Sequence, residues 1–431
     1  MREPAALLVR AGRLVDPASG LDRPAALLAR EGRIEAILDA DAPLPRGAEE
    51  VDARALVLAP GFVDLHVHFR DPGDGRAEDV GTGGRAAAAG GFTTVCCMAN
   101  TSPVNDAPEV TRGIAERAAR SSPIEVLPIA AVTRGLAGRE LTDFAALKAA
   151  GAAALSDDGR PVLDDGTMAE ALRRARALGL VVVDHAEDTR LSLGGAIHEG
   201  DVARRLGVKG ISSESETAMV ERDARLAAET GGALHVAHAS AAGSFDAVRA
   251  ARRAGARVTC EVSPHHLTLT VDALSSGDPD FKMNPPLRTR SDVEAAIEAI
   301  RDGTAGAIAT DHAPHAAAEK AKGIERAPFG VVGLETAFAI VHTRLVHEAG
   351  VLGLADLLRL LTCGPASILG LDRGALAPGR PADFALVDPG ARSTIDPARF
   401  RSRSRNTPFR GTRVTGAVVA TYRSGRRVHP D

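Results

Sequence analysis

The chain has 431 residues, of which 45% are hydrophobic and 25% charged. This length suggests roughly three domain-sized units or one large barrel with an addition, and the composition is that of an ordinary soluble globular protein. The net charge of -4 gives no electrostatic reason to bind nucleic acid or an anionic membrane. No apolar run approaches the roughly 20 residues of a membrane span, so we expect neither partner.

The cysteines and the N-terminus both indicate a cytoplasmic protein. Cys96, Cys97, Cys260 and Cys363 form no C-x-x-C pair. Adjacent cysteines are poor disulfide partners, so reduced thiols are the simplest interpretation. The opening residues MREPAALLVRAGRLVDP contain no sustained apolar core and therefore do not resemble a signal peptide.

Both ends of the chain are typical of short strands. The N-terminal runs AALLVR, AALLAR and RIEAIL are separated by turns with Gly and Pro. From about residue 371 the runs ALAPGRPADFALVDPG and GAVVATYRSGRRV are again strand-like. We therefore expect residues 1–55 and 371–431 to form one small composite β domain beside a larger domain at 56–370.

The larger domain alternates β runs with Ala-, Arg- and Glu-rich helical patterns. Eight such alternations predict the α/β class and an eight-stranded parallel TIM-type (β/α) barrel. A doubly wound open sheet is the alternative, but no G-x-G-x-x-G leads from a strand into a helix. Residues 335–370 are typical of helices. The candidate strands lie at 56–68, 91–98, 125–132, 152–157, 180–187, 233–240, 257–264 and 305–312.

The first strand of this domain ends in PGFVDLHVHFRDPG, residues 60–73. His66 and His68 are two apart in a period-2 pattern, so they project from one face and could hold one metal ion. Arg70 follows two residues later, before a turn. A lone strand histidine is more often a core residue than a ligand, and H-x-H by itself is only a moderate signal. The pair therefore needs partners elsewhere in the chain.

Further polar residues stand at or just beyond the C-terminal ends of the other candidate strands, the face where barrel enzymes build their sites. Histidine and carboxylate ligands suit a hydrolytic zinc site. Two adjacent cations would need an anionic bridge between them. Asp157 and Asp158 face opposite ways on an extended chain, so only one can bridge, and the pattern leaves the choice open. The polar residues at the C-terminal ends of these other candidate strands are Asn100, Asp157, Asp158, His185, His238, His265 and Asp311.

Several other histidines and a basic run have simpler interpretations. His235 precedes His238 by three residues on a strand and should face away from a metal. The run RFRSRSRNTPFRGTR at 399–413 is interpreted first as a solvated surface and second as a site for an acidic partner. The roles of His265 and His266 stay open. Four further histidines fall in helical or terminal stretches and are interpreted as ordinary surface residues. They are His198, His342, His347 and His429.

Many of these motifs are shared with one known family. The chain resembles the bacterial class I dihydroorotases of the amidohydrolase superfamily over nearly its whole length, and DLHVHFRDPG together with ATDHAPH is highly specific. The resemblance implies the same barrel with a composite β domain. The matching segments are GFVDLHVHFRDPG, AAAAGGFTTV, MANTSPVND, SDDGRPV, DHAED, LHVAHAS, EVSPHHL, KMNPPLR, IATDHAPH, FGVVGLET, APGRPADFALVD and NTPFRGTRVTG.

The resemblance implies one or two zinc (Zn²⁺) ions, with a binuclear site favoured and Asp158 as the bridge. Many relatives bridge with a carboxylated lysine instead. No lysine lies on the fourth predicted strand, and Lys148 falls in the preceding helix. The implied first metal set is His66, His68, Asp158 and Asp311, and the implied second set is Asp158, His185 and His238.

The implied reaction is the reversible hydrolysis of the cyclic amide of (S)-dihydroorotate to N-carbamoyl-L-aspartate, in pyrimidine (UMP) biosynthesis. Asp311 would carry the proton from the nucleophile to the leaving nitrogen. Arg70 would hold the substrate carboxylate through a charge-assisted, two-pronged contact. Ala99 and Ala186 depart from the family pattern, but neither is a ligand. The implied substrate contacts are His68, Arg70, Asn100, Asn284 and His315, with backbone groups at Phe329 and Gly330.

Two rival functions remain to be weighed. Hydantoinases, dihydropyrimidinases and allantoinases share the metal site but do not all need an arginine for a carboxylate. A catalytically dead scaffold for aspartate carbamoyltransferase should have lost ligands, whereas this chain retains the full set. An active enzyme could also form a homodimer, or a complex with aspartate carbamoyltransferase.

Overall fold

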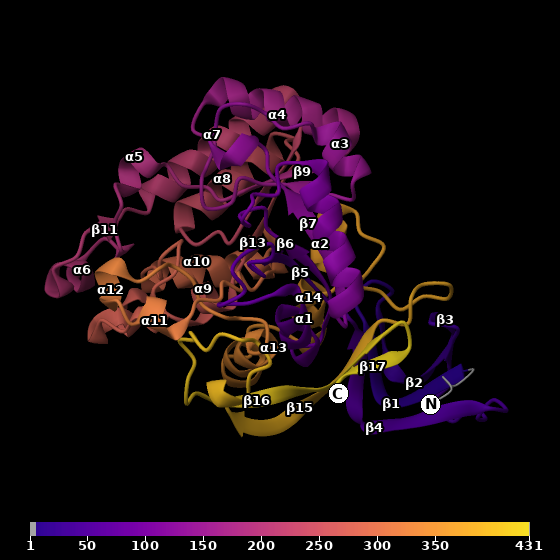
Figure 1. Cartoon of the computed structure of the whole chain (residues 1–431). Coiled ribbons are helices and arrows are strands. Elements are labelled where there is room, and N and C mark those ends of the chain that lie inside the picture. Colours follow the sequence, from indigo (N-terminus) through magenta and orange to yellow (C-terminus); the bar gives the residue numbers. More distant parts are fainter. Residues whose placement is uncertain (1–5, 431) are drawn as a thin grey trace.

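The computed structural model describes residues 6–430, which form two large sheets with helices around one of them (Figure 1). One sheet has eight strands from the middle of the chain, and the other has seven strands from both ends. Residues 1–5, which include the start of the first expected strand and of the stretch inspected for a signal peptide, lie outside the described residues. No helix within 6–430 is both long and apolar enough to cross a membrane.

The eight-stranded sheet is parallel and closes into a barrel. Its order is β14-β13-β12-β9-β8-β7-β6-β5, so successive barrel strands are neighbours. The barrel closes where the backbone N–H of His68 donates to the carbonyl of His312 at 2.8 Å. The predicted (β/α) barrel is confirmed, and the sheet is not an open doubly wound one. Its strands are β5 (Phe62–Val67), β6 (Phe92–Cys97), β7 (Glu125–Ala130), β8 (Ala154–Leu155), β9 (Val181–Asp184), β12 (Ala233–Val236), β13 (Val258–Val262) and β14 (Ala305–Ile308).

Helices follow the barrel strands and surround the sheet (Figure 1). Local sequence sets their ends. In one helix Thr289 and Asp292 form a capping box, and another ends at Gly179 with φ +66°, a conformation that favours glycine. The helices are α1 (Val80–Ala89), α2 (Pro108–Ser121), α3 (Phe144–Ala149), α4 (Asp165–Leu178), α7 (Glu214–Thr230), α8 (Ala242–Arg253), α10 (Arg290–Arg301), α13 (Ala337–Val341), which continues as a π-helical turn (His342–Glu348), α14 (Leu354–Leu361) and α15 (Cys363–Leu369).

Short elements follow strand ends β9, β13 and β14, on the side of the barrel where the predicted ligands lie. Figure 1 shows most of them gathered on one flank of the barrel. They give this flank most of its irregular structure. They are α5 (Thr189–Ser192), β10 (Ile197–His198), α6 (Asp201–Leu206), β11 (Gly210–Ile211), α9 (Pro264–Thr268), the 3₁₀ turns Val271–Ser276 and Pro279–Phe281, α11 (Ala317–Lys320) and α12 (Gly323–Arg326).

The seven-stranded sheet combines strands from both ends of the chain, as expected. Its order is β17-β16-β15-β4-β1-β2-β3, and only the β1–β4 pair is parallel. Leu14, Leu27 and Phe384 are fully buried in its own hydrophobic cluster. The strands are β1 (Ala6–Asp16), β2 (Leu21–Arg30), β3 (Arg33–Leu38), β4 (Ala48–Pro60), β15 (Phe384–Thr394), β16 (Arg413–Arg423) and β17 (Arg426–His429).

The expected single strand at 56–68 is wrong in one respect, because it is two strands in two sheets. β4 ends at Pro60 and β5 begins at Phe62. Gly61 makes the junction, since its N–H donates to Asp383 O at 3.0 Å and a Cβ there would lie 2.2 Å from the Thr93 side chain. The chain therefore passes directly from the small sheet into the strand that carries His66.

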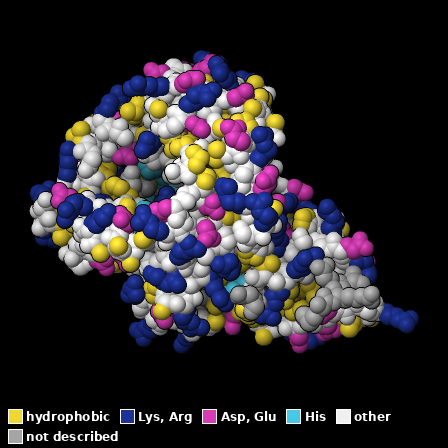
Figure 2. Space-filling view, viewed as in Figure 1, with side chains coloured by type: hydrophobic (Ala, Val, Ile, Leu, Met, Phe, Trp, Pro, Cys, Tyr) yellow, Lys and Arg dark blue, Asp and Glu magenta, His cyan; other side chains and the backbone are white. Residues whose placement is uncertain are grey.

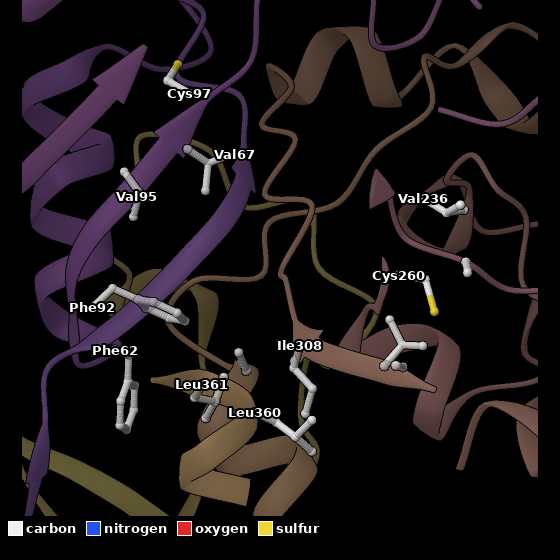
Figure 3. Close-up of a cluster of buried hydrophobic side chains, with 14 of the residues drawn as sticks. Phe62, Val67, Phe92, Val95, Cys97, Val236, Cys260, Ile308, Leu360 and Leu361 are labelled. Atoms are coloured by element: carbon white, nitrogen blue, oxygen red, sulfur yellow. The ribbon is translucent and has the colours of Figure 1, made fainter. Parts of the chain in front are cut away.

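Packed aromatic and aliphatic side chains hold the start of β5 in place. The rings of Phe62 and Phe92 meet edge to face at 5.7 Å, and Phe62 also lies 5.8 Å from Phe338. Leu360 and Leu361 of α14 belong to the same buried cluster (Figure 3). Each fully buried phenylalanine contributes up to about 3 kcal/mol. This packing anchors the strand whose far end reaches the site.

Candidate active site

The six predicted metal ligands converge at the C-terminal ends of the barrel strands. None is more than 5% exposed. Figure 2 shows a hollow on the surface in which histidine side chains are visible. His66 is the last residue but one of β5 and His68 follows that strand, while Asp158 follows β8, His185 follows β9, His238 follows β12 and Asp311 follows β14.

Asp158 lies at the centre of this cluster. Its Oδ1 is 3.2 Å from His66 Nε2 and its Oδ2 is 3.5 Å from His68 Nε2. Oδ1 also lies 3.6 Å from His185 Nδ1 and 3.7 Å from His238 Nε2. Four imidazoles from three strand ends therefore face one carboxylate, and each presents a single ring nitrogen to it.

Asp311 completes one side of the cluster. Its Oδ1 is 3.2 Å from His68 Nε2 and 3.7 Å from His66 Nε2. Its backbone has φ +46°, and His238 (+33°) and Arg70 (+56°) are also in the left-handed region. This region costs residues with a Cβ roughly 1–3 kcal/mol, and such strain concentrates at functional sites. The barrel mouth therefore holds three site residues in unfavourable backbone conformations.

The adjacent aspartates of SDDG face different neighbours. Asp157 accepts hydrogen bonds from the backbone N–H of Thr133, at 2.9 Å, and from the Thr133 hydroxyl. Burial raises the pKa of Asp157 to about 6. Asp158 is the residue that points into the histidine cluster. Lys148 lies on α3, where its ammonium donates to the Leu178 carbonyl away from the cluster.

The donor set fits a metal ion. Among the described residues, His66 with His68 and Asp158, and Asp158 with His185 and His238, form two groups whose ligand atoms lie within 4.8 Å of one another. The buried atoms His66 Nε2 and Asp158 Oδ1 make no hydrogen bond to any residue of 6–430. Unsatisfied buried polar atoms are costly, so a cation between these donors would relieve that cost. Imidazole and carboxylate donors suit zinc and similar divalent ions.

Electrostatics keep the two aspartates ionised. Burial opposes the charge of Asp158, but His66, His185 and His238 hold its pKa well below the ordinary value. Asp311 is likewise buried, and His68 and the neighbouring imidazoles hold its pKa below the ordinary value. Both side chains can therefore act as carboxylates at neutral pH.

Three ligand histidines have their second ring nitrogen held by a polar side chain. Such partners orient the ring and fix which nitrogen binds metal. The sequence interpretation missed two of them, Glu187 and Glu261. Glu187 follows His185 by two residues in DHAED, and Glu261 is a carboxylate within a buried strand, which is unusual. The contacts are His66 Nδ1–Glu261 Oε1 (3.4 Å), His68 Nδ1–Asn100 Oδ1 (2.9 Å) and His185 Nε2–Glu187 Oε2 (3.1 Å).

Three predicted substrate contacts line one cavity beside the cluster. Arg70, Asn100 and His315 share a cavity of about 430 Å³. Asn100 Nδ2 also lies 3.2 Å from Asp158 Oδ2, so this side chain connects the cavity wall to the cluster. Asn100 therefore belongs both to the cavity wall and to the contacts of the cluster.

Arg70 lines the wall of this cavity, and its positive charge is not paired with a carboxylate of the described residues. Its guanidinium makes no hydrogen bond or ion pair to any of residues 6–430, whereas the nearby Arg76 pairs with Asp74 at 2.6 Å. Burial lowers the pKa of Arg70, and the charges of Asp311 and Asp158 oppose that shift. A half-buried guanidinium with no such partner can bind an anionic group.

Of the remaining predicted substrate residues, Phe329 contacts the cavity residue His315, and neither Phe329, Gly330 nor Asn284 lines this cavity. His315 Nε2 is 2.6 Å from the carbonyl of Phe329, so this nitrogen carries the proton. Burial, Arg70 and other nearby cations lower the pKa of His315 to about 3. Gly330 follows with φ +129°. Asn284 instead donates to Glu187 Oε2 at 2.8 Å and so lies beside His185.

The other histidines partly differ from expectation. His235 contacts Glu261 at 3.1 Å and not the cluster, as expected, and His265 and His266 are buried side by side with ring centroids 4.3 Å apart. His198 and His342 are not surface residues. Both side chains are buried. Nη1 of Arg288 lies 3.3 Å from Nδ1 of His198, and the carbonyl of Thr415 accepts a hydrogen bond from Nδ1 of His342 at 2.8 Å.

The basic run at 399–413 is not simply a solvated surface, so that interpretation is wrong. Ser402, Ser404 and Asn406 are buried, whereas Arg401 and Arg403 are exposed. Polar side chains thus alternate inward with outward arginines, as expected for an extended segment packed on one face. The inward residues contact the mouth of the barrel.

The fold and the site together define an amidohydrolase-type barrel enzyme. Its fold is that of an L-hydantoinase (dihydropyrimidinase) from Arthrobacter aurescens, with a TM-score of 0.88, 25% identity, and coverage of 98% of this chain and 95% of that one. A dihydropyrimidinase from Brevibacillus agri gives a TM-score of 0.84 at 24% identity, covering 98% and 94% of the two chains.

Sequence relatives narrow this class further. A family model described as dihydro-orotase-like matches residues 55–244. The chain is 50% identical to a dihydroorotase of Anaeromyxobacter dehalogenans, covering 99% of this chain and 98% of the relative. It is 47% identical to one of Pelotomaculum thermopropionicum, covering 99% of both. The chain belongs to the dihydroorotase family.

Proposed function

We propose that the protein is a dihydroorotase that reversibly hydrolyses the cyclic amide of (S)-dihydroorotate to N-carbamoyl-L-aspartate, a step of pyrimidine biosynthesis. The observation that carries the proposal is the unpaired guanidinium of Arg70 in a cavity that Asn100 joins to the ligand cluster. Dihydroorotate presents both groups that such a site needs, a carboxylate and a cyclic amide. The names of the full-length relatives support the same assignment.

The cluster would hold one or two zinc ions. His66, His68, Asp158 and Asp311 would bind the first, and His185 and His238 with Asp158 the second. An ion bound there supplies Lewis acidity, which polarises the scissile carbonyl and lowers the pKa of water. The central place of Asp158 between the two groups supports its role as the shared ligand.

Asp311 would move the proton. Because its pKa lies below the ordinary value, it is a carboxylate at neutral pH and can accept a proton from the attacking water. The oxygen of that water bonds to the carbonyl carbon, the ring C–N bond breaks, and Asp311 returns the proton to the leaving nitrogen. In the reverse reaction the same carboxylate accepts the proton of the attacking nitrogen and returns it to the leaving oxygen.

The cavity wall would orient the ring. Arg70 would bind the substrate carboxylate through two parallel N–H···O contacts, which fixes the ring relative to the cluster. Asn100 and His315 would complete that contact. Backbone groups at Phe329 and Gly330, with Asn284 opposite, would bind the polar ring atoms. The contact between His315 and the Phe329 carbonyl supports this grouping.

A hydantoinase or dihydropyrimidinase is the second candidate, favoured by the fold similarity to those enzymes. Purified protein should be assayed with dihydroorotate and with uncharged hydantoin, each before and after chelation and with zinc restored. We expect metal-dependent turnover of dihydroorotate and at least about 100-fold lower kcat/KM for hydantoin. Comparable rates on both substrates would favour the second candidate.

Location and assembly are separate proposals. The four cysteines are free and three are buried, which supports a reducing, cytoplasmic environment. Light scattering of the protein alone tests for a homodimer. The same measurement with aspartate carbamoyltransferase added tests for that complex, and an unchanged mass would argue against it.

A further inference from the structure

A C-terminal segment of the chain packs onto the mouth of the barrel. In residues 401–406 the backbone N–H of Ser402 donates to the carboxylate of Glu335 at 3.0 Å. The hydroxyl of Ser404 donates to the carbonyl of Ala77 at 2.7 Å. The segment thus comes from the part of the chain that also builds the small sheet, yet it contacts loops beside the candidate site.

Asn406, 4% exposed, is the residue of this segment that connects two site loops. Its Oδ1 accepts the backbone N–H of His315 at 3.1 Å. Its Nδ2 donates to the carbonyl of Ala313 at 3.1 Å and to that of Gly330 at 3.0 Å. One amide therefore uses both donor hydrogens and an acceptor site to hold the loop after β14 against the loop at Phe329.

We propose that Asn406 is a positioning residue that sets the spacing between these two loops and thereby the affinity for the substrate. The inference rests on the proposed dihydroorotase function, in which His315 and Gly330 contact the ring. Asn406 itself lines no part of the cavity with Arg70. Its effect is therefore transmitted through the backbone of the residues it holds.

Lys320 explains why losing Asn406 should not unfold the loop. Its buried ammonium donates to the carbonyls of Gly330 (3.0 Å), Pro328 (3.2 Å) and Lys282 (3.2 Å) and pairs with no carboxylate among the described residues. The Gly330 carbonyl thus keeps one donor when the other is removed. What disappears with Asn406 is the acceptor for the His315 N–H and one donor each for the carbonyls of Ala313 and Gly330. The contact between His315 and the Phe329 carbonyl remains, so we expect the spacing of the loops to loosen and not to be lost.

Three variants separate positioning from general stability. Asn406→Ala removes every side-chain contact. Asn406→Asp keeps the acceptor for the His315 N–H but removes both donors. Ser404→Ala is the matched control, because it deletes a buried hydrogen bond of the same segment without touching either site loop. For each zinc-loaded variant we would measure KM and kcat for dihydroorotate, bound zinc, Tm, and amide hydrogen exchange over residues 313–316.

We expect Asn406→Ala and Asn406→Asp to raise KM about tenfold with kcat changed less than about threefold. Zinc content should be unchanged. Exchange at His315 should accelerate in Asn406→Ala and stay slow in Asn406→Asp. Ser404→Ala should resemble the parent in KM, kcat, bound zinc and exchange, with a lower Tm because a buried hydrogen bond is lost. If Asn406→Ala does not fold, the aspartate variant decides by its KM.

Parent-like KM in Asn406→Asp, or an equal rise in Ser404→Ala, would overturn the inference. A kcat loss that merely follows lost zinc would overturn it as well. If the parent protein does not turn over dihydroorotate, the proposed function fails instead. The exchange measurement still tests the contact between Asn406 and His315 in that case.

Discussion

His66 Nδ1 lies 3.4 Å from Oε1 of Glu261, on the opposite side of the ring from Asp158. Glu261 is fully buried, and its other oxygen is 3.1 Å from His235 Nε2. Burial opposes its charge, but His235 and His66 lower the pKa of Glu261 to about 2. A permanent carboxylate at this place keeps the proton of His66 on Nδ1 and leaves Nε2 free for a metal.

Glu261→Gln should therefore weaken zinc binding about 10- to 100-fold, as is typical when the partner of a ligand histidine is changed. The cause is loss of the charge that orients the imidazole and increases its basicity. Zinc affinity would be measured by competition with a chromophoric chelator. Glu335→Gln is the control and should bind zinc normally, because the Glu335 carboxylate accepts the backbone N–H groups of Arg401 and Ser402 and faces no histidine of the cluster. Equal affinities in the two variants would contradict the prediction.

The adjacent aspartates offer a matched pair of substitutions. Asp158→Asn removes the charge that four histidines face and should abolish bound zinc and activity. Asp157→Asn alters the contacts with Thr133 and Val132 and none with the cluster, so zinc content should stay the same and the free energy of unfolding should fall by about 1–2 kcal/mol. Metal analysis and denaturant unfolding of both proteins test this. Zinc loss in Asp157→Asn would show that the assignment is reversed.

Much of this site could be predicted from local sequence. Period-2 spacing places His66 and His68 on one face, and the alternation of strands and helices brings the other ligands to one barrel rim. The choice between Asp157 and Asp158 could not be made this way, because it depends on whether Thr133 or the histidines lie nearer. Only the resemblance to a family selected Asp158, and in the structure Asp158 is the aspartate that faces the histidines.

Other features depend on contacts that no local pattern contains. Glu261 and His66 are far apart in the chain and meet only because β13 and β5 belong to one closed barrel. The break at Gly61 arises from the Thr93 side chain on the neighbouring strand. The burial of Ser402, Ser404 and Asn406 is different, since the alternation of arginines with small polar residues was present in the sequence.

Arg70 provides the test of substrate choice. Arg70→Ala should lower kcat/KM for dihydroorotate about 100-fold or more, because the substrate carboxylate loses its charge-assisted contacts. Arg70→Lys should recover only part of this, since an ammonium cannot make two parallel contacts. Zinc content should be unchanged in both, because the guanidinium contacts no ligand side chain. Steady-state kinetics with metal analysis decide the matter, and loss of zinc in step with activity would assign Arg70 to the metal site instead.

The ion pair between Glu216 and Arg288 predicts a specific pH dependence of stability. Arg288 donates to Glu216 Oε2 at 3.0 Å, with both side chains at most 3% exposed. Burial opposes ionisation of Glu216, but Arg288 and the hydrogen bonds from Ser240 and Ala241 lower its pKa to about 2. The ordinary value is 4.5. Because the folded pKa is the lower one, this group stabilises the fold above pH 4.5 and loses that contribution as the pH falls towards 2.

The contribution lost over this range is about 3 kcal/mol. Denaturant unfolding of the parent and of Glu216→Gln, both metal-free so that zinc release does not contribute, should be compared at several pH values between 7 and 2.5. At neutral pH the variant should be less stable by about 3–5 kcal/mol, since it leaves Arg288 buried without its partner. The difference should shrink below pH 4.5, because only the parent then loses a charge at this position. A difference that is constant with pH would mean that the pKa of Glu216 is not lowered in the folded protein.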